Sequence, residues 1–294
     1  MVRLLRVRRA LRGITADFLD LPGPPAPGQF MLPQPNAFRS RFRNSDGSYD
    51  WKSELDYGWE LYDQSSCGSL AACLVECVQG DGGIHVLPPG YLQALKKHCE
   101  RRGALLIADE AQTGLGRTGT MFAFQDHGIV PDVLTLSKPL ANGLPLSAVV
   151  MSAEINSIAK ENGFLFFTTH ANDPLVAAVG NKVLEIVLRD DLASNAKQRG
   201  EQLLCGLRRL QDKYSFIGDV RGCGLMVGVE TVAGDGCKDH APEVASRLST
   251  LMLKSGLWCQ LQNKAVFRIG PPINCTSDEI EDGLRILEEV FSSV

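Results

Sequence analysis

The chain has 294 residues, which is long enough for two modest domains with a sizeable core. Its formal net charge of −4 gives no reason to expect nucleic acid or an acidic membrane as a partner, and no apolar run approaches the length of a membrane span. The nine cysteines are scattered and never spaced C-x-x-C, which argues against a disulfide framework or a zinc site and for an intracellular compartment.

The N-terminal segment allows two interpretations. Residues 1–13 contain five arginines and no acidic residue. Mitochondrial presequences have such a composition, but they are usually rich in serine as well. We therefore favour the stub of a larger domain in a cytoplasmic protein, with a mitochondrial protein as the alternative. Residues 20–48 are rich in proline, glycine and polar residues, which predicts an irregular surface loop.

The rest of the chain alternates between strand and helix patterns. Strands are predicted at residues 71–78, 104–110, 132–138, 148–152, 217–221 and 225–230. Helices are predicted at residues 51–64, 89–101, 174–214, 242–255 and 277–291. This alternation indicates an α/β fold with a mostly parallel sheet that is covered on both faces. We divide the chain into an irregular segment (1–48), a large domain (49–190) and a smaller C-terminal α+β domain (191–294).

Two charged residues stand at the ends of predicted strands. Asp109 ends the apolar run L-L-I-A, and Lys138 ends V-L-T-L-S. Ligands of open α/β sheets gather beyond the carboxyl ends of strands. An acid can keep the ring nitrogen of a cofactor protonated, and a lysine in a dry pocket can act as a nucleophile, so this pair suits pyridoxal phosphate. Taken singly, Asp109 could instead cap the next turn, and Lys138 could be an ordinary solvated lysine.

The motifs around these residues resemble those of a known family. D-E-A-Q-T-G-L-G-R-T-G begins at Asp109, and the lysine of L-S-K follows 29 residues later. Together with I-G-D-V-R-G-C-G-L and V-F-R-I-G-P-P, they resemble the class III pyridoxal-phosphate-dependent aminotransferases, and within that class most closely the 2,2-dialkylglycine decarboxylases. The resemblance extends from residue 49 to the C-terminus. It implies the fold type I of pyridoxal-phosphate-dependent transferases, amino acid and oxo acid substrates, and a homodimer or higher homo-oligomer.

The resemblance also implies roles for five residues. Lys138 would bind the cofactor covalently and then move protons, Asp109 would hold the pyridine nitrogen, and Gln112 would hydrogen-bond the ring's phenolic oxygen. Thr169 would bind the cofactor phosphate of the neighbouring subunit, and Arg268 would hold the substrate carboxylate by paired hydrogen bonds. Apart from the resemblance, Thr169 could be a helix N-cap and Arg268 a surface ion pair. No metal ligands are expected.

Three further charged residues in these motifs receive no role in the chemistry. They are Glu110 and Arg117 in the first motif and Arg221 in the second. We interpret them as structural residues, which could pair with one another.

Two departures from the family pattern leave the function open. The family's N-terminal part, with its phosphate-binding turn and ring-stacking aromatic residue, precedes the matching segment and is absent from this sequence. Gly80 and Asp81 replace two serines of the decarboxylases, and an aspartate there would repel a substrate carboxylate if it pointed into the pocket. Overall similarity favours a decarboxylase, whereas Asp81 favours a plain transaminase.

The alternative to an enzyme is a non-catalytic remnant that retains the fold and the dimer surface, and the missing cofactor cup suggests it. A nucleotide-binding protein that uses G-L-G-R-T-G fits less well, because the sequence has neither a G-x-G-x-x-G nor a P-loop pattern.

Overall fold

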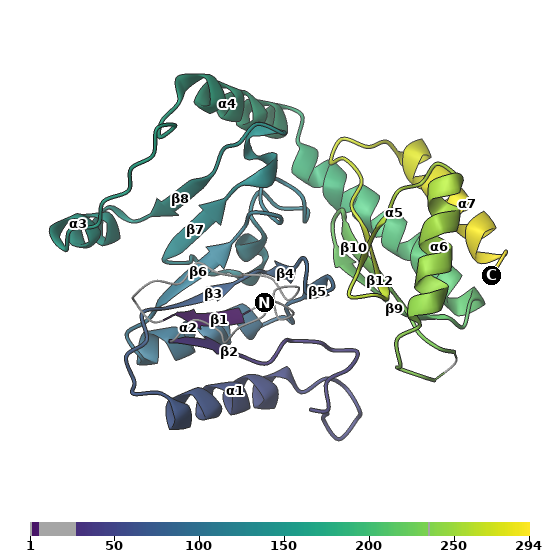
Figure 1. Cartoon of the computed structure of the whole chain (residues 1–294), viewed down its shortest axis with the longest axis horizontal. Helices are drawn as coiled ribbons and strands as arrows, with labels where there is room; N and C mark the ends of the chain where they lie inside the picture. The colour runs from purple at the N-terminus through teal and green to yellow at the C-terminus, as the bar shows by residue number, and fades with distance from the viewer. Residues whose placement is uncertain (1, 6–27, 235) are drawn as a thin grey trace.

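The computed structural model of the chain describes residues 2–5, 28–234 and 236–294. Two parts lie side by side (Figure 1), one around a six-stranded sheet and the other around a four-stranded sheet. Two consecutive helices lead from the first part to the second, α4 (Pro174–Arg189) and α5 (Leu192–Lys213). The predicted helical stretch 174–214 is therefore two helices, separated by Asp190 and the left-handed Asp191.

The six-stranded sheet has the order β2-β1-β3-β6-β7-β8. Its strands are β1 (Val2–Leu5), β2 (Gln29–Met31), β3 (Ala72–Val75), β6 (Leu105–Asp109), β7 (Val133–Leu136) and β8 (Ala148–Met151). The central strands β3, β6 and β7 are parallel, whereas β1, β2 and β8 run antiparallel to their neighbours. The predicted α/β fold is thus confirmed, with parallel pairing confined to the centre of the sheet. The link between β7 and β8 is too short for a crossover helix, so β8 returns antiparallel.

Helices α1 (Trp51–Ser65) and α2 (Tyr91–Arg101) pack against each other, and α2 also packs on β6. Their buried residues, Trp59 and Leu95 among them, form the core of this part. Along β6 buried and half-buried residues alternate, and Val149 and Val150 of β8 are exposed. Within the described chain the sheet is therefore only partly covered, contrary to the expectation that both faces would be buried.

Part of the segment predicted as an irregular loop is ordered. Residues 29–31 form β2, and the next residue, Leu32, is buried in the core. Strand β1 likewise comes from the arginine-rich segment, of which only residues 2–5 are described. Residues 20–27 of the predicted loop lie outside the described residues.

The C-terminal part is an antiparallel sheet with the order β11-β12-β10-β9, packed against helices. Its strands are β9 (Ile217–Cys223), β10 (Met226–Thr231), β11 (Gln260–Gln262) and β12 (Val266–Ile269), and its helices are α5, α6 (Pro242–Lys254) and α7 (Ser277–Phe291). The buried residues of its core run from Ala196 to Phe291. The boundaries at residues 48 and 190 stay predictions.

The two parts meet at the turn that follows β6. The backbone N–H of Leu225 donates to the carbonyl of Arg117 at 3.0 Å, and Nη1 of Arg117 donates to the carbonyls of Leu225 (3.1 Å) and Pro271 (2.5 Å). Gly224 lies so close that a Cβ added to it would be 2.5 Å from the carbonyl carbon of Thr118. This contact fixes the end of β6 relative to the strand that carries Arg268.

Candidate active site

Asp109 ends β6 directly beside Thr135 of β7, its partner in the parallel register. Its Oδ1 accepts hydrogen bonds from the Thr135 hydroxyl and from the backbone N–H of Ala111, both at 3.0 Å. Among the described residues, its Oδ2 has no hydrogen bond. One oxygen of this half-buried carboxylate therefore orients the side chain, and the other is available to a cationic or donating group.

The neighbouring carboxylate, Glu110, is used differently. It points to the opposite side of the strand, as the two-residue repeat requires, and is 1% exposed. It accepts hydrogen bonds from the Thr113 hydroxyl (2.5 Å) and the Phe124 backbone N–H (2.9 Å). Burial raises the pKa of Glu110 despite these hydrogen bonds. Both of its oxygens are thus bound within the protein, in keeping with the structural role predicted for it.

The pairing suggested among the three structural charges is wrong. Arg117 binds backbone carbonyls, and Arg221 pairs with Asp219 and Glu230 at 2.7 Å each. Each of these three residues binds other partners instead, and the sequence alone does not show which elements bring those partners close.

Lys138 follows β7 and begins η3 (Lys138–Ala141), a short 3₁₀ helix. Its φ of +42° is unusual for a residue with a side chain and is typical of constrained functional positions. Lys138 is exposed and makes no hydrogen bond or ion pair with the described residues. Desolvation of the amine lowers the pKa of Lys138, Arg268 lowers it further, and Asp81, Glu76 and Asp109 oppose the shift. A lowered pKa favours the neutral amine that a nucleophile requires.

Gln112 lies in the turn after β6 and faces the loop between β4 (Val78–Gln79) and β5 (His85–Val86). A Cβ at Gly80 in this loop would lie 2.6 Å from the Gln112 amide, so any other residue there would displace the end of the Gln112 side chain. The buried Oε1 of Gln112 has no hydrogen-bond partner in the described part of the chain. The oxygen and the nitrogen of a side-chain amide are told apart only by their hydrogen-bond partners. Since this end of Gln112 lacks one there, it can offer either a donor or an acceptor to a ligand.

Arg268 reaches the same region from β12. Its Nη1 lies 3.7 Å from Oδ1 of Asp81, which belongs to the loop between β4 and β5. The same oxygen accepts a hydrogen bond from Nε2 of Gln262 on β11 at 3.1 Å. The sequence raised a conflict between Asp81 and a substrate carboxylate. The structure places Asp81 beside the arginine that is predicted to bind that carboxylate.

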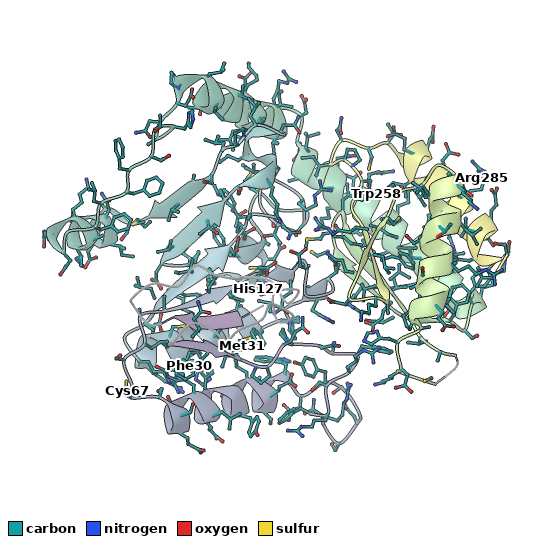
Figure 2. The ribbon with its side chains drawn as sticks, viewed as in Figure 1. Phe30, Met31, Cys67, His127, Trp258 and Arg285 are labelled. Carbon is teal, nitrogen blue, oxygen red and sulfur yellow. The ribbon has the colours of Figure 1, made fainter. Side chains whose placement is uncertain are left out.

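Thr169 is not brought to this cluster. It is exposed, in the segment between α3 (Ala153–Glu161) and α4 that stands away from the sheet (Figures 1 and 2). The alternative that Thr169 caps a helix is wrong, because Asp173 caps α4 by accepting the Leu175 N–H at 3.1 Å. The role predicted for Thr169 in a neighbouring subunit stays a prediction.

The sequence reasoning missed Gln262. It stands at the end of β11, and the sequence pattern around L-Q-N-K gave no prediction of a strand there. A usable signal was Asn263, because asparagine tolerates the positive φ of a tight hairpin turn. That turn pairs β11 with the strand of Arg268.

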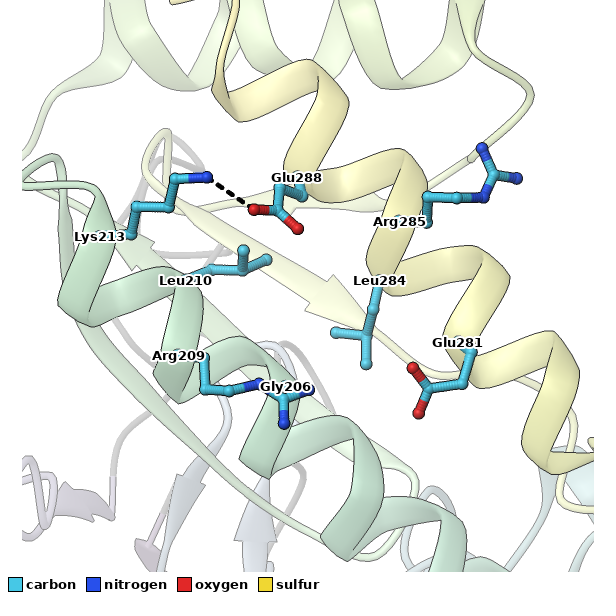
Figure 3. A pocket seen from close by; sticks show the side chains of 8 residues that line it. All are labelled: Gly206, Arg209, Leu210, Lys213, Glu281, Leu284, Arg285 and Glu288. Atoms are coloured by element: carbon cyan, nitrogen blue, oxygen red, sulfur yellow. Dashed lines mark hydrogen bonds and ion pairs between the residues drawn. The ribbon is translucent and has the colours of Figure 1, made fainter.

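Other hollows in the described chain suit a ligand less well. A groove of about 330 Å³ lies between α5 and α7 (Figure 3), and an ion pair between Lys213 and Glu288 at 2.6 Å spans it. A cleft of about 270 Å³ is lined by Arg117, Pro139 and Pro272 and adjoins the site through Pro139. Among residues 2–5, 28–234 and 236–294 we find no helix long and apolar enough to cross a membrane, and no group of three or more His, Cys, Asp or Glu side chains that could hold a metal ion.

The cluster fits pyridoxal phosphate. Counting only contacts with described residues, Asp109 has a free carboxylate oxygen for the pyridine nitrogen, Gln112 has an unpaired amide for the phenolic oxygen, and Lys138 has an unpaired amine. These are the three ring contacts that the resemblance implied, and two neighbouring parallel strands and their turns supply them.

Comparison with known proteins agrees with this assignment. The sequence model of the class III aminotransferases matches residues 15–291. The chain is 47% identical over 274 residues to an uncharacterised aminotransferase of Schizosaccharomyces pombe, covering 92% of this chain and 61% of that protein. It is 34% identical to the acetylornithine aminotransferase of Caldanaerobacter subterraneus, covering 82% of this chain and 58% of the relative.

Among solved structures, an amine transaminase from an uncultivated Pseudomonas species in its pyridoxal-phosphate-bound form is similar, with a TM-score of 0.85 and 29% identity. The match covers 94% of this chain and 64% of that one. The chain thus spans about three fifths of the length of the curated relatives it matches. The predicted fold type I and pyridoxal phosphate cofactor are confirmed. The chain belongs to the class III aminotransferase family.

Proposed function

We propose that this chain acts in an aminotransferase that moves an amino group between an amino acid and an oxo acid with pyridoxal phosphate. The observation that carries the proposal is the convergence of Asp109, Gln112 and Lys138 at the carboxyl ends of β6 and β7. Family membership and the similarity to aminotransferases support it. Because the chain spans only part of the length of its relatives, the comparison establishes the family, and the activity of this chain is our proposal.

Each side chain has a part in the proposed reaction. When bound, the cofactor's ring withdraws electrons from the bond that breaks at the substrate carbon. Asp109 Oδ2 would accept the N–H of the pyridine ring and keep that nitrogen charged. The Gln112 amide would hold the phenolic oxygen of the ring. The Lys138 amine, with its lowered pKa, takes the proton from the substrate carbon and returns it.

Arg268 and Asp81 favour transamination over decarboxylation. A substrate carboxylate must compete with Asp81 for Arg268, and once bound to the arginine it is held in place. A carboxylate elsewhere in the pocket would face the negative charge of Asp81. Loss of carbon dioxide requires the bond between the substrate carbon and its carboxylate to be oriented for cleavage. Transamination requires only the C–H bond of that carbon to be oriented in this way. The decarboxylase activity that overall similarity favoured is therefore our second candidate.

We further propose that a second copy of the chain covers the segment between α3 and α4. Four consecutive residues of this segment, Phe164–Phe167, are between 64% and 86% exposed. Such a run of apolar side chains on a surface marks an interface. Thr169 follows two residues later and would reach the partner's site from this interface.

The reaction type can be tested with 2-aminoisobutyrate, which has no C–H bond at the amino carbon. Purified chain with pyridoxal phosphate is offered alanine or 2-aminoisobutyrate, together with an oxo acid acceptor. We expect amino transfer from alanine and no carbon dioxide from 2-aminoisobutyrate. Release of carbon dioxide would establish the decarboxylase instead, and no reaction with either substrate while the protein is folded would favour the non-catalytic remnant.

A further inference from the structure

The loop that carries Asp81 is tied to the protein at every residue. The contacts that hold it are Glu76 to the N–H of Gly80 (2.9 Å), Asn263 to the carbonyl of Asp81 (3.4 Å), Gln34 to the carbonyl of Gly82 (2.8 Å) and Arg221 to the carbonyl of Gly83 (2.8 Å). Ile84, which ends the loop, is fully buried with a φ of +58°. The backbone of Asp81 therefore cannot retreat without breaking several contacts, and only its side chain is free to change partners.

The carboxylate of Asp81 has two partners at unequal distances. Its Oδ1 is 3.1 Å from Nε2 of Gln262, which is a hydrogen bond, and 3.7 Å from Nη1 of Arg268, which is longer than one. A carboxylate can only accept, so the nitrogen end of the amide must face it. In the structure Asp81 is thus held first by a neutral amide and only second by the arginine.

Gln262 is itself fixed in place. It is 6% exposed, it ends β11, and the tight turn through Asn263 and Lys264 follows it. Its Oε1 is buried and has no hydrogen-bond partner among the described residues. The hydrogen bond to Asp81 is the only one that the Gln262 side chain makes within the described part of the chain, so it accounts for the orientation of this buried amide.

We propose that Gln262 is a positioning residue that holds Asp81 away from Arg268 and so keeps the arginine available to a substrate carboxylate. The inference rests on the proposed function in taking Arg268 as the carboxylate-binding group. Without the amide, the contact with the guanidinium is the side-chain interaction that remains to Asp81 among the described residues, and the two would close into a direct ion pair. An incoming carboxylate would then have to break that pair. Gln262 in this way sets how strongly the site selects substrates that carry a carboxylate.

The test follows the Arg268 side chain by NMR in the full chain without cofactor, so it does not depend on activity. Gln262→Met keeps the volume and removes the donor, and circular dichroism checks that it folds. Without ligand, the Nε–Hε signal of Arg268 should move on Gln262→Met in the direction opposite to its movement on Asp81→Asn. No movement, or movement in the same direction, would overturn the proposal.

Propionate then serves as the carboxylate probe. Gln262→Met should weaken its binding to Arg268 about tenfold, and the same substitution in an Asp81→Asn background should have no effect. Equal weakening in both backgrounds would mean that Gln262 only supports the fold, and would overturn the proposal. If propionate shifts the Arg268 signal in none of the proteins, the carboxylate-binding role in the proposed function fails, while the ligand-free signals still decide whether Gln262 holds Asp81.

Discussion

The adjacent carboxylates Asp109 and Glu110 should differ sharply in their effect on the cofactor. Asp109→Asn keeps an oxygen that can accept from Thr135 and Ala111, so the local fold should survive. It removes the charge at Oδ2, where the pyridine nitrogen would bind. A hydrogen bond between charged groups contributes about 1.5–3 kcal/mol. We therefore expect pyridoxal phosphate to bind roughly 10- to 150-fold more weakly to Asp109→Asn.

Glu110→Gln is the matched control. Glutamine can accept from the Phe124 N–H and donate to the Thr113 hydroxyl, and it removes a charge whose burial is unfavourable. We expect its unfolding free energy to stay within about 1 kcal/mol of the original and its cofactor affinity to stay the same. Cofactor titration followed by absorbance gives the affinities, and urea unfolding gives the stabilities. The reasoning is refuted if Asp109→Asn binds normally, or if Glu110→Gln loses as much affinity.

Three further outcomes are expected. Gly80→Ala should weaken cofactor binding in the same titration, because its Cβ would collide with Gln112 at 2.6 Å, and unchanged affinity would show that Gln112 lies off the ring. Burial lowers the pKa of His85 to about 3, from 6.5 in an unfolded chain, so stability is lost as the pH falls from 6.5 to 3, by up to about 5 kcal/mol. Urea midpoints at pH 7 and pH 4 should therefore differ less in His85→Gln, and an equal difference would contradict this. Phe166→Asp should lower the mass measured by light scattering, whereas Val130→Asp, at another exposed apolar residue, should not.

The sequence was sufficient to place residues at the ends of strands. Asp109 and Lys138 each follow an apolar run, and parallel neighbours bring the ends of such runs to one edge of the sheet. Helices with clear apolar periodicity were also predicted close to their observed bounds, for example 51–64 against Trp51–Ser65. The short strands β2 and β11 were not predicted, because they have three residues each, which is too few to show alternation.

What the sequence could not supply were contacts between distant segments. Asp81 looked like an obstacle to the substrate because nothing local indicates that Arg268 lies beside it. Glu230 likewise proved to be the buried partner of Arg39, which is 191 residues away in the sequence. Such pairs depend on how the elements pack, and neither charge pattern nor spacing determines that.

Whether Lys138 carries the cofactor can be decided by covalent trapping. The chain is incubated with pyridoxal phosphate, reduced with borohydride and digested, and the modified peptide is identified by mass spectrometry. We predict a single modified lysine, Lys138, together with a visible absorption band that Lys138→Ala abolishes while the protein stays folded. Labelling spread over exposed lysines, or a band that survives in Lys138→Ala, would contradict the assignment of this site.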